Sequence, residues 1–182
     1  LRETPFEELY IQPSAGDGGG ALGAALVAWH CALGNSKRLV MEHAYWGQSY
    51  GTRDVSSALD AAGFKGVYIE DNSRLVEATV DRLLNGQVVS WFQGRFEWGP
   101  RALGNRSIIA DPRRAETKDI VNTKIKFREP FRPFAPAVLA EASEQYFELS
   151  EPDRHMPARF MLLVVPVREQ KQDAIPAVSH MG

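Results

Sequence analysis

The chain has very little cysteine and no long apolar run. Cys31 is its only cysteine, so no disulfide can form within the chain and a zinc site of four thiolates is excluded. No stretch approaches the roughly 18 consecutive apolar residues of a membrane helix, and the first residues lack the basic and apolar regions of a secretory signal. These absences predict a soluble protein of the cytoplasm that does not engage a membrane.

Excess positive charge is also missing from the chain as a whole. Its 21 lysines and arginines face 23 acidic residues, which gives a net charge of -2 and a pI near 6.1. Non-specific affinity for nucleic acid needs an excess of basic side chains, so nucleic acid is not an expected partner. The four histidines lie too far apart in sequence to pair on one helix, and no complete histidine-based metal site is predicted.

Length and composition are those of an ordinary globular domain. The 182 residues are 44% apolar and 24% charged, and one domain usually holds roughly 100–200 residues. The chain starts at Leu1 rather than at methionine, and it stops at Gly182 directly after an apolar stretch. We therefore expect a fragment of a longer protein.

The apolar pattern predicts a mixed α/β fold. A glycine turn introduces an alanine- and leucine-rich helix at 21–33, and an irregular aromatic loop covers 45–53. Further helices are expected at about 53–62, 73–84, 115–123 and 142–147, and strands at 66–69, 88–92, 106–110, 134–139 and 160–165. Five strands could form one sheet covered by helices.

A segment rich in glycine and arginine follows the predicted strand at 88–92. It runs from Gly94 to Ser107 and reads GRFEWGPRALGNRS. Its three glycines allow backbone conformations and close approaches that side chains block, and its three arginines offer planar donors for oxyanions. This combination predicts a phosphate pocket.

A second basic segment covers residues 124–134. Between Arg101 and Arg132 nine lysines and arginines face four acids, a local excess of +5, so the remaining residues sum to -7. Such a concentration favours an anionic ligand. Alternatively, single basic residues could be solvated at the surface or paired with Glu97, Asp111 or Glu129. Arg113, Arg114 and Lys118 are the first candidates for plain surface residues.

Residues 94–113 and 122–136 resemble the signature segments of the C-terminal domain of carbamoyltransferases, a family that includes antibiotic and nodulation-factor O-carbamoyltransferases. That domain is similar to the YrdC fold, a twisted α/β sheet with flanking helices and a positively charged concave face. The resemblance implies that residues 41–182 are this domain, truncated. It also implies that carbamoyl phosphate and ATP react there to carbamoyl-adenylate and pyrophosphate, with Mg²⁺ bridging phosphate oxygens.

The resemblance also implies site residues. In YrdC-like proteins a Lys-x-Arg pair grips the phosphates, and Lys126-Phe127-Arg128 has this pattern. Arg101, Lys126 and Arg128 are therefore the candidate catalytic residues, because they would neutralise charge as it develops. Further phosphate-binding candidates are Arg95, Arg106, Ser107 and Arg132. No dedicated nucleophile is needed, so Ser90, Ser107 and Cys31 are expected to be structural or hydrogen-bonding groups.

The N-terminal glycine turn, PSAGDGGGALGAA at residues 13–25, resembles the last nucleotide-binding loop of the actin-like ATPase fold in its Kae-type version. This implies that residues 1–40 end an actin-like domain and that Gly16, Asp17 and Gly18 bind a nucleotide cofactor. In that family the aspartate helps two histidines hold an iron; Asp17 matches it, but the histidine pair is missing here. In isolation, a glycine turn with Asp17 capping the next helix explains the same residues.

These features together predict a fragment of an O-carbamoyltransferase. Its acceptor would be a hydroxyl of a sugar-containing molecule, a nodulation factor or an antibiotic, bound mainly by the missing N-terminal domain. The fragment is not expected to complete the transfer, which the family performs at the iron of the full-length enzyme. The alternative is a YrdC-like module that binds nucleotides or RNA without catalysis. A purely structural α/β domain would instead scatter its basic residues over the surface.

Overall fold

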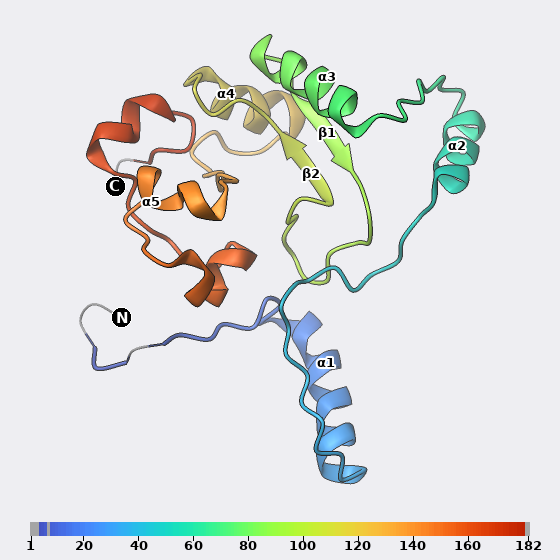
Figure 1. The fold of residues 1–182 in the computed structure, drawn as a ribbon, viewed down its shortest axis with the longest axis vertical. Coiled ribbons are helices and arrows are strands. Elements are labelled where there is room, and N and C mark those ends of the chain that lie inside the picture. Colours follow the sequence, from blue (N-terminus) through green and yellow to red (C-terminus); the bar gives the residue numbers. More distant parts are fainter. Residues whose placement is uncertain (1–3, 7, 181–182) are drawn as a thin grey trace.

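A short antiparallel hairpin forms the sheet of the described part of the chain. The computed structural model describes residues 4–6 and 8–180 (Figure 1). β1 (Val89–Phe92) pairs with β2 (Arg106–Ile109), with Val89 opposite Ile109 and Phe92 opposite Arg106. The predicted strands at 88–92 and 106–110 are thus confirmed. Because the strands are antiparallel, residues 93–105 leave one end of the hairpin and the chain after Ile109 leaves the other.

Helices make up most of the remaining regular structure. α1 (Asp17–Val27) continues as a π-helical stretch at Ala28–Ala32, and α4 (Glu116–Asp119) continues in the same way at Ile120–Ile125. The others are α2 (Thr52–Ala61), α3 (Asn72–Leu84) and α5 (Ser143–Tyr146), with 3₁₀ turns at Ala140–Ala142, Pro152–Arg154, Met156–Phe160 and Glu169–Ala174. No helix in the described ranges has the length and apolar character needed to cross a membrane.

Local side chains fix where α2 and α3 begin. The carboxylate of Asp71 accepts the backbone N–H of Ser73 at 2.8 Å and so caps α3. The carboxylate of Asp54 accepts the backbone N–H of Gly51 at 2.8 Å at the start of α2. α3 then lies against β1, whereas α2 stands away from the sheet (Figure 1).

Three of the five predicted strands are wrong. Residues 66–69 have no regular secondary structure and no ladder partner among the described residues, and Val67 is 89% exposed. Residues 134–139 follow Pro133 and contain Pro136, which lack the N–H that a ladder needs. At 160–165, Phe160 ends a 3₁₀ turn and Met161 adopts a φ of 55°, so the chain turns. The mixture of helices and a small sheet is consistent with the predicted α/β class.

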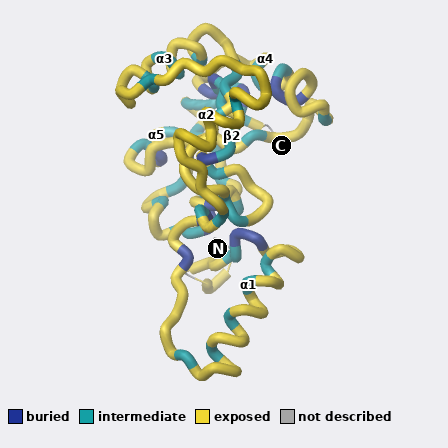
Figure 2. Tube along the Cα trace, turned by 90° about the vertical axis from the view of Figure 1, so that its right-hand side faces the viewer, coloured by how far each residue is buried: buried dark blue, intermediate teal, exposed yellow. Residues whose placement is uncertain are grey.

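The hydrophobic core lies where the N-terminal segment meets the loop between the strands. Met41, Ala44 and Phe160 are buried there, and the side chains packed against them are Leu22, Trp98, Leu103, Met156 and Leu162. Figure 2 shows that α1, by contrast, is mostly exposed with a few partly buried positions, and none of its residues is fully buried. Leu22 of α1 thus packs across the predicted boundary between residues 40 and 41. The two-domain division itself stays a prediction.

Phe160 anchors this core, because it is 1% exposed. We expect Phe160→Ala to lower the free energy of unfolding by about 3–5 kcal/mol, since it removes a buried ring and leaves a cavity. Urea unfolding followed by circular dichroism measures the change. Phe131→Ala is the matched control, because Phe131 is 75% exposed and its loss should cost less than about 0.5 kcal/mol. Equal losses in the two variants would contradict this core.

Candidate functional site: two basic loops and their anchors

The carboxylate of Glu97 organises the loop between the two strands. Its Oε1 accepts the backbone N–H groups of Leu103 at 2.8 Å, Asn105 at 2.8 Å and Arg106 at 3.2 Å. Partial burial opposes the charged form, but these backbone hydrogen bonds outweigh it, and the pKa of Glu97 is lowered. Three backbone donors of this glycine-rich loop are therefore occupied by the chain's own carboxylate.

Arg106 braces the same loop against the hairpin. Its guanidinium carbon lies 3.7 Å from the ring centroid of Phe92 and 3.9 Å from that of Phe96. Its terminal nitrogens donate to the backbone carbonyls of Gln93, Gly94 and Asn105. Most of its donors are thus used within the loop, and a role in phosphate binding stays a prediction. The neighbouring hydroxyl of Ser107 accepts the N–H of Gly104 at 3.0 Å.

The other two arginines of the loop are exposed. The Nε of Arg95 donates to the carbonyl of Gly47 at 2.9 Å. For the side chain of Arg101, no hydrogen bond or ion pair is found within residues 4–6 and 8–180. The loop thus presents one guanidinium with all of its donors available.

The second basic segment wraps around the buried amide of Asn122, which is 0% exposed. Its Nδ2 donates to the carbonyls of Pro130 at 3.1 Å and Arg132 at 3.0 Å, and its Oδ1 accepts the Nε of Arg128 at 2.7 Å. The guanidinium of Arg128 also lies 4.9 Å from the ring centroid of Phe134. Arg128 is therefore half-buried and anchored, while Lys126 is exposed.

Most basic residues between 101 and 132 have a partner. Arg113 binds Asp111 at 2.6 Å, which is the first cause of the lowered pKa of that carboxyl group. The remaining partnered residues are Arg106, Arg114 with Glu116, Lys118 with His180, Arg128, and Arg132 with Glu129. In the part of the chain that the structure describes, only Arg101, Lys124 and Lys126 have no such partner. Pairing with Asp111 and Glu129 is as the alternative predicted, but Glu97 binds backbone instead.

The two basic loops leave opposite ends of the hairpin. Residues 93–105 connect β1 to β2, whereas residues 124–134 follow the far end of β2 through α4. Across the described ranges, no hydrogen bond or ion pair joins one loop to the other. That Arg101 and Lys126 share one site therefore stays a prediction.

The N-terminal glycine turn lies against residues 93–105, the loop between β1 and β2, which we call the Arg101 loop. Gly99 has a φ of +106°, and a side chain there would approach the carbonyl oxygen of Pro13 to 3.3 Å. Gly16 precedes α1 as its capping residue and Asp17 is already in the first turn, so the interpretation of Asp17 as the cap is wrong. The cofactor role predicted for Gly16, Asp17 and Gly18 is not tested by these contacts.

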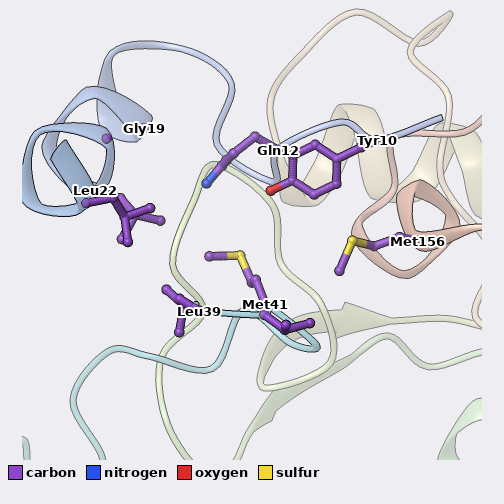
Figure 3. A pocket seen from close by; sticks show the side chains of 10 residues that line it. Tyr10, Gln12, Gly19, Leu22, Leu39, Met41 and Met156 are labelled. Atoms are coloured by element: carbon purple, nitrogen blue, oxygen red, sulfur yellow. The ribbon is translucent and has the colours of Figure 1, made fainter. Parts of the chain in front are cut away.

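A cavity of about 390 Å³ opens beside this turn, between α1 and residues 39–41 (Figure 3). Tyr10 and Gln12 lie on one side of it and Leu39 and Met41 on the other. Its lining includes Gly19 and Leu22 of α1 but no lysine or arginine. An apolar cavity without a cation is unsuited to phosphate. None of its lining residues belongs to the two basic loops.

The described residues contain no group of three or more metal-binding side chains. Asp17 therefore stands alone as a possible ligand. A single carboxylate does not fit an iron site, which needs several donors, so no step is assigned to iron in this chain.

Sequence reasoning missed both anchors. Glu97 stood among three arginines and was considered only as an ion-pair partner, although a carboxylate can equally bind backbone N–H groups. Asn122 lies next to Val121 in a stretch predicted as helix. Nothing in the sequence indicated that this amide side chain is buried. Both anchors bind residues across a bent loop, which periodicity does not encode.

The family model described as Carbamoyltransferase C-terminus matches residues 80–182. Nodulation protein NolNO of Sinorhizobium fredii is 43% identical over 100% of this chain, which corresponds to 26% of that protein. Nodulation protein NolO of Bradyrhizobium diazoefficiens is 42% identical over 97% of the chain and 32% of its own length. The 3'-hydroxymethylcephem-O-carbamoyltransferase of Streptomyces clavuligerus is 34% identical over 97% of the chain and 30% of its own length. The chain thus spans about a quarter to a third of these relatives.

Glu97 makes stability depend on pH in a defined direction. Because its pKa is lowered in the folded state, its contribution is present above the ordinary carboxyl pKa and is lost as pH falls through the folded value. Glu97→Gln should therefore be less stable than wild type at neutral pH, and the difference should shrink as pH falls below about 4. Urea unfolding at a series of pH values measures this. The exposed Glu77→Gln on α3 is the control, and a difference that grows at acidic pH would contradict the assignment.

Asn122 holds the second basic segment. Asn122→Ala leaves buried donors and acceptors without partners, so we expect a loss of about 1–3 kcal/mol per orphaned group in unfolding free energy. It should also accelerate amide hydrogen exchange in residues 126–132. The matched control is Asn85→Ala, whose exposed amide donates only to Asp81. Unchanged exchange in residues 126–132 would show that Asn122 does not anchor the loop.

Proposed function

Because the chain belongs to the family of the carbamoyltransferase C-terminus, we propose that it forms the part of an O-carbamoyltransferase that makes carbamoyl-adenylate from carbamoyl phosphate and ATP. The conversion takes up water at the phosphate of carbamoyl phosphate and releases phosphate and pyrophosphate. Mg²⁺ would enter with ATP, since this ion is usually held largely by phosphate oxygens. In the longer protein the carbamoyl group would then pass to a hydroxyl of an acceptor.

The observation that carries the proposal is the pattern of partnered and unpartnered cations. Glu97 and Asn122 hold the two loops in shape and bind the neighbouring donors, whereas Arg101 and Lys126 have no partner in the described residues. A cation that is not neutralised internally on a fixed loop is suited to an anionic ligand. Both substrates are polyanions, which supports the assignment.

The residues would have different tasks. The guanidinium of Arg101 offers a planar pair of donors, which suits bidentate binding of a phosphate. Lys126 supplies a compact positive charge on a flexible side chain. This charge can stabilise the negative charge that develops on a phosphate as the bond to it breaks. Arg128 is held by Asn122, so it would supply positive charge from a fixed position. No side chain of this chain needs to act as a covalent nucleophile.

The acceptor and the transfer step belong to the proposal for the longer protein. The cephem relative has an acceptor in its name, and the nodulation relatives carry the name of a process. We propose a hydroxyl acceptor bound outside this chain, because the chain spans about a quarter to a third of those relatives. The iron of the transfer step would likewise need donors from outside the described residues.

Isothermal titration with carbamoyl phosphate and with a non-hydrolysable ATP analogue tests the proposed site. Arg101→Ala and Lys126→Ala should each weaken binding about ten- to a hundredfold, since each removes a charge-assisted contact of about 1.5–3 kcal/mol. The control is Arg154→Ala, which removes an exposed arginine that binds Glu151 outside the basic window. It should leave both affinities unchanged.

Two outcomes would overturn the proposal. If a folded wild-type chain binds neither ligand, the site does not lie within this chain. If binding falls steeply with salt and ignores carbamoyl phosphate, the chain is a general nucleotide or RNA binder without catalysis.

A further inference from the structure

A second, smaller pocket lies where two backbone segments pair beside the Arg101 loop. Its lining is His43, Tyr45, Trp46 and Arg95, and its volume is about 170 Å³. The N–H of Gly47 donates to the carbonyl of Phe96, and the N–H of Trp98 donates to that of Ala44, so the pocket rests on a backbone frame. The sequence predicted no pocket here: Tyr45 and Trp46 were expected in an irregular aromatic loop, and Arg95 was a phosphate-binding candidate.

Three of the four side chains are flat rings. The rings of His43 and Tyr45 are stacked, with centroids 5.7 Å apart and an angle of 22°, and Trp46 lies edge-on to His43 at 6.2 Å. The indole N–H of Trp46 donates to the carbonyl of His43 at 2.8 Å, which fixes the indole. Such a group of rings offers faces on which a planar ligand can stack.

The pocket also has donors for a nitrogen-rich ring. The Nε of Arg95 donates to the carbonyl of Gly47, which positions the guanidinium, and its terminal nitrogens have no hydrogen-bond partner among the described residues. The N–H of Tyr45 donates to the Nδ1 of His43 at 3.3 Å, which leaves the Nε2 of His43 as the ring nitrogen that can donate to a ligand. A purine presents several ring nitrogens as acceptors, which matches this set.

Size and position restrict what the pocket can take. Whole small-molecule ligands fill pockets of roughly 300–1,000 Å³, so about 170 Å³ suits one ring system and not a complete nucleotide. The hydroxyl of Tyr45 donates to the carbonyl of Leu103 at 2.6 Å, which ties the pocket to the loop two residues beyond Arg101. A ligand with its ring here has phosphate-binding residues nearby along the chain.

We propose that the pocket of His43, Tyr45, Trp46 and Arg95 binds the purine ring of a nucleotide whose phosphates reach the Arg101 loop. The second half of this statement rests on the proposed function, while binding of a purine by the pocket does not. Stacking on Trp46 supplies affinity, and the donors of Arg95 and His43 select a ring that carries acceptors.

Calorimetric titration of the 182-residue chain with three ligands tests this inference. The ligands are adenosine, which has the base without phosphate, an ATP analogue, and inorganic pyrophosphate, which lacks the base. Trp46→Leu keeps an apolar side chain but removes the ring, so it should weaken adenosine and the ATP analogue about five- to a hundredfold. Pyrophosphate binding should not change, and Trp46→Phe should retain most of the affinity for adenosine.

Trp29→Leu is the matched control. Trp29 is 41% exposed and Trp46 is 38% exposed, and the indole of each donates to a backbone carbonyl, that of Lys37 for Trp29. The control should leave all three affinities unchanged. If wild type does not bind adenosine, or if Trp46→Leu binds it as wild type does, the pocket takes no purine.

The two proposals can fail separately. If Trp46→Leu leaves the ATP analogue unaffected while Arg101→Ala weakens it, the purine proposal falls and the adenylation site stands. If adenosine binding depends on Trp46 but wild type releases no pyrophosphate from ATP and carbamoyl phosphate, the pocket stands and the proposed function falls.

Discussion

The fold of the candidate site depends on one carboxylate that binds backbone. Glu97 accepts three N–H groups from residues 103–106, and these bonds bend the glycine-rich loop into a closed shape before any ligand is present. A negative side chain in a ring of N–H groups is the arrangement that otherwise binds a phosphate. Here the carboxylate of Glu97 occupies three of the backbone donors, so the anion site proposed for this loop relies on side chains, above all on Arg101.

The sequence predicted local features well and long-range ones poorly. The helices α2 and α3 and the strands β1 and β2 were placed within a residue or two, because capping carboxylates and apolar periodicity are local. The predictions of strands at 66–69, 134–139 and 160–165 were wrong. A strand forms only where a second segment pairs with it, and the residue pattern of a short segment does not show whether such a partner exists. Pro136 was a local sign against the strand at 134–139, whereas the positive φ of Met161 within 160–165 is seen only in the structure.

The site shows the same division. Clustering of basic residues at 101–132 is readable from composition, but which of them are neutralised is decided by contacts across bent loops. Arg106 and Arg128 were predicted to bind phosphate like Arg101, yet one lies against two phenylalanine rings and the other is bound to a buried amide. Which basic residues have no hydrogen-bond or ion-pair partner can be seen only from the contacts of the folded loops, including those of Glu97 and Asn122. Anchors of this kind are single residues without a repeating pattern, so sequence periodicity cannot reveal them.

Contacts at the start of α1 give the basic loop a second boundary. Gly99 lies close to Pro13, Leu22 and Trp98 both pack against the buried cluster that contains Met41, and Tyr45 donates to the carbonyl of Leu103. The Arg101 loop is therefore held by two sets of contacts, one with the N-terminal turn and one with Tyr45 of the aromatic pocket. A loop held at both sides loses little conformational entropy when a ligand binds. This constraint, and not the number of basic residues, is what makes the loop suited to hold an anion in one orientation.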